Sequence, residues 1–374
     1  MTPENGHQKR NSLRFMFHLE AWPLLLLIVL FLGAAAAVWL AGQKLSDSTD
    51  ALSSHYGLGQ ALGGLILLAI VTNLPELAIT TSAALGDNLG IAVGNILGGI
   101  ALQTVVLVVL DVWGVGPKTT LTYHAASLVL VLEGAIVIGV LALVIMGTQM
   151  PASVIFLRLT PGSVAIAAVW IGGLLLVNRA QKEMPWQAKG DAPGGQDSEP
   201  GGEKDGDPPR KKKLKGDKLG KAWTTFGLGA LVTLICGVLL ERSGDAIAGH
   251  IGMNGVLFGA TFLAASTSIP EVSTGLASIK IGDTKLAFSD IFGGNAFLPV
   301  LFLLATLLSG KAVLPQAHKS DIYLTGLGII LTSIYMIGLI LRPRRQILRM
   351  GVDSFAVLVC YILGIVGIIA VGNR

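Results

Sequence analysis

Ten apolar runs, each long enough to cross a bilayer, constrain this chain more than any other feature of its sequence. A hydrocarbon core of about 30 Å needs roughly 20 apolar residues per helix. Charged residues make up only 13% of the chain, whereas soluble domains contain roughly 25%. The sequence therefore predicts an all-α polytopic membrane protein. The ten runs lie at about 22–41, 57–85, 89–112, 121–147, 153–177, 223–242, 252–281, 285–309, 320–341 and 352–372.

The first run resembles a signal peptide in one respect, because Lys9, Arg10 and Arg14 precede it. Its apolar part is longer than the roughly 7–15 residues of such a segment. We therefore expect a true first transmembrane helix after an amino-terminal tail at 1–21.

A hydrophilic segment at 179–221 separates the fifth run from the sixth. Its central part, "AKGDAPGGQDSEPGGEKDGDPPRKKKLKGDK", is rich in Gly, Pro and charge and has almost no apolar residue. Such a segment cannot bury a core, so it is predicted to be a disordered linker between a five-helix repeat at 22–178 and a second at 222–374. Its acidic residues lack the spacing of an EF-hand. Its basic end, "RKKKLK" at 210–215, is suited to anionic lipid headgroups.

The distribution of Lys and Arg predicts the orientation. With the amino terminus outside, most of the 27 Lys and Arg fall on the inner side, many of them in the linker. The positive-inside rule then places both termini outside and the linker in the cytoplasm, although the basic amino-terminal tail favours the reverse. We expect an integral protein of the cell membrane, either a plasma membrane or a bacterial inner membrane.

The sequences of the two halves can be aligned with each other without a gap. Because each half has an odd number of predicted helices, the second would enter the membrane inverted relative to the first. A shift that takes Pro75 to Pro270 aligns two polar motifs, "TNLPELAITT" (72–81) and "TSIPEVSTGL" (267–276), and then two Gly-rich segments. The same shift pairs Gly57 with Gly252, Gly64 with Gly259, Ala69 with Ala264, Thr72 with Thr267, Glu76 with Glu271, Ala92 with Ala287, Gly98 with Gly293, Gly99 with Gly294 and Ala101 with Ala296.

Each polar motif combines two costly features in a membrane. Its proline interrupts the helix and frees carbonyl oxygens, and its glutamate places a carboxylate in the apolar layer. Hydroxyl and amide oxygens from Thr72, Asn73, Thr267 and Ser268 stand beside them. Hard oxygen ligands suit sodium or calcium rather than a soft metal. In an inverted repeat the two motifs meet near the midplane, so we interpret them as two halves of one cation site.

On these motifs the chain resembles the calcium/cation antiporter superfamily, which includes the sodium/calcium exchangers. The segments 57–112 and 252–309 resemble its paired alpha-repeats, and the helix number and central loop also agree. The resemblance implies that Glu76 and Glu271 are the central calcium ligands. It further implies that Thr72, Thr267 and Ser268 bind ions, that the carbonyls of Ala69 and Ala264 complete the site, and that the first and sixth helices slide across the core to alternate access.

The chain also departs from the exchanger pattern. Position 73 is Asn, where exchangers usually have Ser, and Gly99 and Gly294 stand where the family has serines. At a later position where the family has a polar or acidic ligand, this chain has Gln103 in the first half and Leu298 in the second. Sodium/calcium exchange is the leading expectation, with calcium/proton or other cation/proton exchange as the alternative. The possible additional ligands are Asn95, Gln103, Asp290 and Asn295.

Several other polar residues are predicted to have structural roles or to contact the membrane surface. Glu133 is predicted to make a structural hydrogen bond or a subunit contact, and the charged residues at helix ends are predicted to contact lipid headgroups. The latter are Asp111, Glu241, Arg242, Asp245, Asp321 and Asp353.

No phosphate loop, nucleophile elbow or zinc motif occurs in the sequence, so we expect a transporter rather than an enzyme. We expect no cofactor, since calcium, sodium or protons would be the transported ions. The expected partners are membrane lipids and the transported cations, with no nucleic acid and with a homo-oligomer as an option. A membrane sensor that binds ions without transporting them is the alternative from another class.

Overall fold

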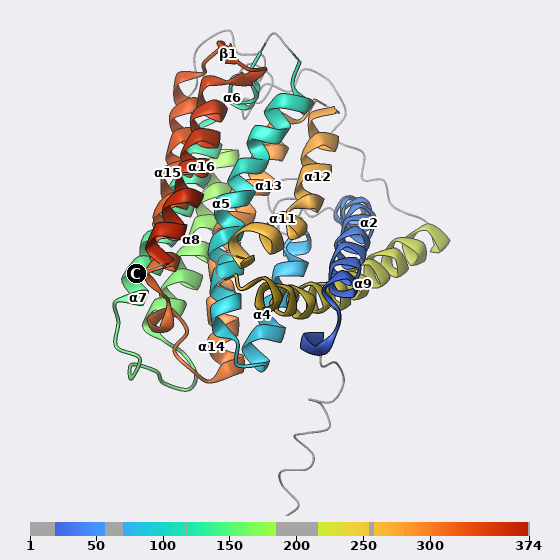
Figure 1. The fold of residues 1–374 in the computed structure, drawn as a ribbon. Coiled ribbons are helices and arrows are strands. Elements are labelled where there is room, and N and C mark those ends of the chain that lie inside the picture. The colour runs from blue at the N-terminus through green and yellow to red at the C-terminus, as the bar shows by residue number, and fades with distance from the viewer. Residues whose placement is uncertain are drawn as a thin grey trace, which may run out of the picture.

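The computed structural model describes residues 19–56, 70–116, 119–184, 216–253, 258–280 and 282–372. These residues form a helical bundle that carries one short hairpin, β1–β2, at one end (Figure 1). Most of the predicted linker, 185–215, lies outside the described residues, and so does the start of the second predicted span.

The elements follow the predicted spans closely in number and order. The first half contains η2 (Leu19–Ala21), α2 (Leu24–Tyr56), α4 (Leu74–Leu85), α5 (Leu89–Gly114), α6 (Leu121–Ala125), α7 (Leu128–Thr148) and α8 (Pro161–Lys182). The second half contains α9 (Gly216–Ile251), the π-helical η4 (Gly259–Leu263), α11 (Ala264–Thr267), α12 (Ile269–Lys280), α13 (Thr284–Phe297), η5 (Leu298–Val300), α14 (Leu301–Ser309), η6 (Leu314–Gln316), α15 (Lys319–Leu341), β1 (Gln346–Ile347), β2 (Met350–Gly351) and α16 (Val352–Gly372).

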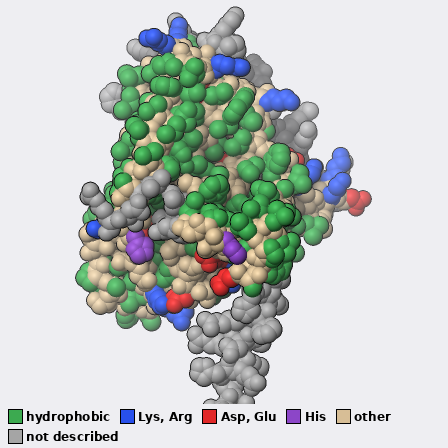
Figure 2. All heavy atoms as spheres, viewed as in Figure 1, with side chains coloured by type: hydrophobic (Ala, Val, Ile, Leu, Met, Phe, Trp, Pro, Cys, Tyr) green, Lys and Arg blue, Asp and Glu red, His purple; other side chains and the backbone are tan. Residues whose placement is uncertain are grey.

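Within the described residues, seven helical segments are long and apolar enough to cross a membrane, and Val352–Ile368 is a shorter apolar helix. The two motif helices fall outside this set because each is broken near its proline. Hydrophobic side chains cover the body of the molecule, while many of the charged side chains in view lie toward its two ends (Figure 2). This surface is that of an integral membrane protein.

Three helices have boundaries that differ clearly from the predicted runs. The fifth helix starts at Pro161 rather than at 153, because Thr160 and Ser163 form a capping box just before it. The helices α2 and α9 extend well beyond the predicted runs 22–41 and 223–242. Their additional turns are polar, so hydropathy alone did not include them, but the two helices pack along each other.

The two halves run in opposite directions through the bundle (Figure 1). The helix α5 rises from the lower end to the upper end, whereas α13 and α14 descend from the upper end to the lower. Likewise α4 leads from the middle to the lower end, and α12 leads from the middle to the upper end. The fold is therefore a ten-helix inverted repeat, in which both polar motifs lie at mid-height.

The long helices α2 and α9 contact the two motif prolines symmetrically. A Cβ on Gly42 of α2 would lie 3.0 Å from Cβ of Pro270, and a Cβ on Gly237 of α9 would lie 3.1 Å from the carbonyl oxygen of Pro75. Gly42 and Gly237 are separated by the same shift that relates the two prolines. Each long helix thus passes close to the motif of the other half at a residue without a side chain.

Most of the helix-end charges are not exposed to lipid headgroups as predicted. Asp111, Glu241, Asp321 and Asp353 are buried, because other helices or loops cover them. Glu241 accepts a hydrogen bond from the Ser82 hydroxyl at 3.0 Å, and Asp321 accepts one from the His318 backbone N–H at 2.6 Å.

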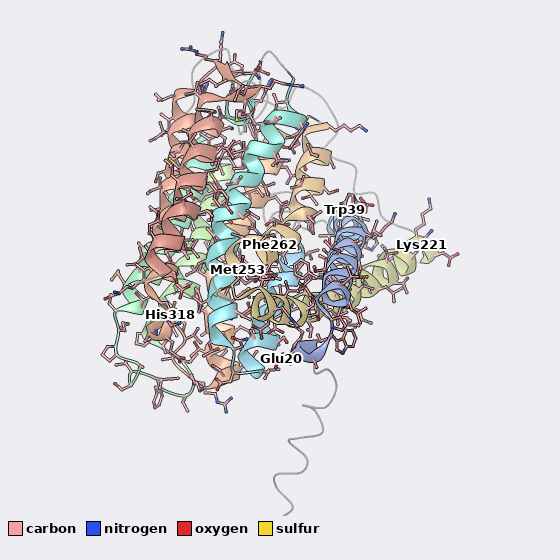
Figure 3. All side chains as sticks on the ribbon, viewed as in Figure 1. Glu20, Trp39, Lys221, Met253, Phe262 and His318 are labelled. Carbon is pink, nitrogen blue, oxygen red and sulfur yellow. The ribbon has the colours of Figure 1, made fainter. Side chains whose placement is uncertain are left out.

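His318 lies at the lower end of the bundle, whereas Lys221 lies at the outer end of α9 (Figure 3).

Candidate cation site

Both polar motifs interrupt a helix just before the proline. In the first half the interruption falls at Asn73, and α4 then begins with Pro75 in its first turn. In the second half a π-helical turn, η4, and the short α11 lead to the interruption at Ser268, after which α12 begins. Because proline has no N–H and displaces the carbonyl one turn earlier, the helix cannot run through this position unbroken. The chain thus presents two half-helices, α4 and α12.

The two motif glutamates lie in the first turns of these half-helices. Glu76 is 0% exposed and Glu271 is 1% exposed. Glu271 interacts electrostatically with both Glu76 and Asp290, so the structure brings the three carboxylates into one region. The positive ends of the α4 and α12 dipoles lie at the same place and offset part of this negative charge.

Several buried oxygen atoms of the predicted ligands have no hydrogen-bond partner among the described residues. They are both carboxylate oxygens of Glu76, Oε2 of Glu271, Oε1 of Gln103 and the side-chain oxygens of Asn95 and Asn295. The Thr267 hydroxyl lies near the Glu76 carboxylate and donates to the carbonyl oxygen of Ala264 at 3.2 Å. A buried polar group without a partner costs about 1–3 kcal/mol. Hard oxygens in this state fit a cation such as calcium or sodium.

An amide network joins the two motifs. Nε2 of Gln103, on α5, donates to Oδ1 of Asn73 at 3.2 Å and to Oε1 of Glu271 at 3.3 Å. A Cβ on Gly294 would lie only 2.9 Å from Nδ2 of Asn73. The glycine at 294 and the asparagine at 73 therefore fit each other, and a serine at 294 would crowd the amide.

Asp290 connects the same two motifs from α13. Its carboxylate accepts a hydrogen bond from Thr72 at 3.5 Å and another from Thr274 at 2.9 Å. The sequence did not single out Thr274, because its counterpart in the first half is Ile79. Its place one turn after Glu271 was the only signal that could have identified it.

Some of the predicted ligands are already engaged, and one lies outside the described residues. The carbonyl oxygen of Ala264 accepts hydrogen bonds from the Ser268 backbone N–H and from the Thr267 and Ser268 hydroxyls. Asn295 donates to the Thr104 hydroxyl at 3.0 Å. Ala69 lies outside the described residues. Within the described chain, no group of three His, Cys, Asp or Glu side chains is arranged to hold a metal ion, so a cation would also need hydroxyl, amide or carbonyl oxygens.

Three further positions add no unpartnered oxygen: Gly99 and Leu298 have no side-chain oxygen, and those of Glu133 have a hydrogen-bond partner. A Cβ on Gly99 would lie 3.5 Å from Cδ1 of Leu298, so the two positions face each other as apolar neighbours. Glu133 is buried on α7, and the Ser289 hydroxyl, whose oxygen lies 2.6 and 2.5 Å from the two carboxylate oxygens, donates its hydrogen to this carboxylate. The structural hydrogen bond predicted for Glu133 is therefore present.

Comparison with known proteins gives consistent results. A family model described as sodium/calcium exchanger protein matches residues 26–177 and 221–370. The putative antiporter CaxA of Alkalimonas amylolytica is 26% identical over 312 residues, which cover 77% of this chain and 81% of CaxA. The inner membrane protein YrbG of Escherichia coli K12 is 24% identical over 301 residues, which cover 80% of this chain and 84% of YrbG.

Two solved structures share the fold. The H+/Ca2+ exchanger CAX aligns with a TM-score of 0.66 at 13% identity, over 96% of this chain and 85% of CAX. The sodium-calcium exchanger NCX_Mj aligns with a TM-score of 0.56 at 16% identity, over 92% of this chain and 99% of NCX_Mj. At such low identity these likenesses concern the fold alone.

Proposed function

This chain belongs to the sodium/calcium exchanger protein family, and from that premise we propose that it is a secondary antiporter that carries calcium across a membrane by alternating access. Glu76 and Glu271 would hold the transported cation, with Thr72, Asn73, Thr267 and Ser268 as further oxygen ligands. Gln103 and Asp290 would position the glutamates and the motif hydroxyls. The peptide carbonyls of Ala69 and Ala264 remain ligands by family resemblance only.

One observation supports this function above the others. Two fully buried carboxylates come from opposed half-helices, and neither forms an ion pair within the described chain. Two negative charges in a low-dielectric region repel each other and lose several kcal/mol of hydration each unless a positive charge compensates them. One divalent cation supplies a charge that offsets both glutamates.

Sodium is the leading counter-ion, by family resemblance. The alternative, exchange for protons, has specific support in the structure: the Gly99–Leu298 contact is apolar, and Gly294 contributes no side-chain oxygen. Several sodium ions need more oxygen ligands than one calcium ion, whereas protons need only the carboxylates.

We place the linker in the cytoplasm on the basis of the positive-inside rule. The β1–β2 hairpin and the carboxyl end of α12 lie at the same end of the bundle (Figure 1), so Arg342, Arg344, Arg345, Arg349 and Lys280 would share the cytoplasmic side.

The close passage of α9 over Pro75 leads to a first test. A Cβ on Gly237 would lie 2.8 Å from Cβ of Ala78 and 3.1 Å from the carbonyl oxygen of Pro75, and a backbone carbonyl cannot rotate away. Overpacking of this kind costs about 1–3 kcal/mol. If α9 slides across α4 during transport, Gly237→Ala should alter the equilibrium between the two states of the alternating-access cycle about 5- to 150-fold. The initial rate of calcium uptake should then fall.

The matched control is Gly227→Ala on the same helix, where nothing lies within 4 Å of the added methyl group. Both variants are reconstituted in proteoliposomes, and uptake is normalised to inserted protein. Equal rates for the two variants would show that the contact at Gly237 has no part in the transport cycle.

A further inference from the structure

A second pair of buried carboxylates, Asp111 and Asp353, lies at the end of the bundle that carries the β1–β2 hairpin (Figure 1). Asp111 belongs to the last turn of α5 and Asp353 to the first turn of α16. Asp111 is 0% exposed and accepts backbone hydrogen bonds from Leu121 and Gly351, both at 2.7 Å. One aspartate thus joins a segment of the first half to a segment of the second.

Asp353 has no comparable partners. It is 6% exposed, and neither of its carboxylate oxygens accepts a hydrogen bond of good geometry from the described residues, although the Thr122 hydroxyl and the backbone N–H groups of Asp353 and Ser354 lie close to the carboxylate. Its carboxylate fits only because two neighbours are glycines: a Cβ on Gly338 would collide with Oδ2, and a Cβ on Gly351 would collide with Oδ1. The backbone of two elements is therefore shaped around the Asp353 carboxylate.

The two carboxylates lie close to each other beside Gly351. A Cβ added to Gly351 would collide with Oδ1 of Asp353 and would lie 3.2 Å from Oδ2 of Asp111. Each carboxylate has a hydroxyl group beside it, Thr122 beside Asp353 and Ser354 beside Asp111, and Tyr335 donates to Ser354 at 3.2 Å. The set consists of hard oxygens, and each carboxylate oxygen that accepts one hydrogen bond keeps a further lone pair.

The pair also lacks a countercharge. Within the described residues neither aspartate forms an ion pair with Lys, Arg or His. Arg344 does not supply one, because its guanidinium stacks 4.8 Å above the ring of Tyr123. Two buried and unpaired negative charges are expensive unless a cation accompanies them.

We propose that Asp111 and Asp353 bind a second divalent cation, of the calcium type, that is not transported. Asp111 is about 12 Å along α5 from Gln103, at 1.5 Å per residue, so this site is separate from the one between Glu76 and Glu271. The bound cation would hold the segment 120–122 of the first half against the segment 351–354 of the second. Calcium would then act on this end of the protein as a stabilising ligand as well as a transported ion.

The test is calcium titration of the full-length protein in detergent, followed by calorimetry. The Glu76→Gln/Glu271→Gln variant removes the carboxylates of the proposed transport site, and we expect it to retain one calcium ion per chain. Adding Asp353→Asn should abolish this remaining binding, while adding Asp87→Asn should leave it intact. Asp87 is exposed, pairs with Lys311 at 2.6 Å at the opposite end, and has a backbone conformation that Asn accepts.

A second variant covers the case in which Asp353→Asn does not fold. Thr122→Val keeps the side-chain shape and removes the hydroxyl beside Asp353, and it should weaken the remaining calcium binding about tenfold. The proposal is overturned if the folded Glu76→Gln/Glu271→Gln protein binds no calcium, which would indicate that Asp111 and Asp353 share a proton instead. It is also overturned if the remaining binding is unchanged by Asp353→Asn or, where that variant does not fold, by Thr122→Val.

Discussion

Glu76→Gln and Glu271→Gln should each abolish calcium flux in proteoliposomes. Each substitution keeps the size of the side chain and removes one of the two negative charges that would balance a divalent cation. A hydrogen bond or contact to a charged group contributes about 1.5–3 kcal/mol, and in a buried region the loss is at the upper end of this range. We therefore expect transport rates to fall about 100-fold or more at subsaturating calcium.

Glu133→Gln is the matched control for this pair. Glu133 is also a buried glutamate in the membrane part, but its carboxylate is satisfied by the Ser289 hydroxyl, and the amide oxygen of Gln can accept the same hydrogen bond. This variant should keep most of the flux. Near-normal transport by either Glu76→Gln or Glu271→Gln would eliminate the paired-carboxylate site.

The second large effect concerns the counter-ion. An imposed sodium gradient should drive calcium uptake into sealed proteoliposomes with the membrane potential clamped, whereas an imposed pH gradient alone should not. If the pH gradient drives uptake and the sodium gradient has no effect, the apolar contact between Gly99 and Leu298 reflects the loss of sodium ligands, and the protein is a calcium/proton antiporter.

The same experiment separates transport from sensing. A sensor that retains the fold would bind calcium in detergent, but neither gradient would move calcium across the membrane. Uptake under either gradient excludes the sensor, and its absence in a well-inserted protein that binds calcium would favour it.

The sequence predicted the features of the fold that depend on local composition. Apolar run lengths located the ten spans, and the two prolines located the interruptions at Asn73 and Ser268, because both effects act within a few residues. The full lengths of α2 and α9 were not predictable from hydropathy, because their polar turns are held by packing between two helices far apart in the chain.

The site was predictable only as far as the internal repeat reached. Matching the halves brought out the two glutamates and their neighbours, but it concealed Thr274, whose counterpart Ile79 is apolar. It also could not show that Asp111 and Asp353 are buried together. That contact joins segments about 240 residues apart, and only the assembled fold reveals it.

The central claim is that Glu76 and Glu271 share one cation, and the most direct measurement is a structure of the protein in saturating strontium, with strontium located by its anomalous scattering. Strontium is a calcium analogue with a strong anomalous signal. We predict a peak that contacts carboxylate oxygens of both Glu76 and Glu271. Density for both side chains without a strontium peak between them, or a peak bound by one glutamate alone, would contradict the claim.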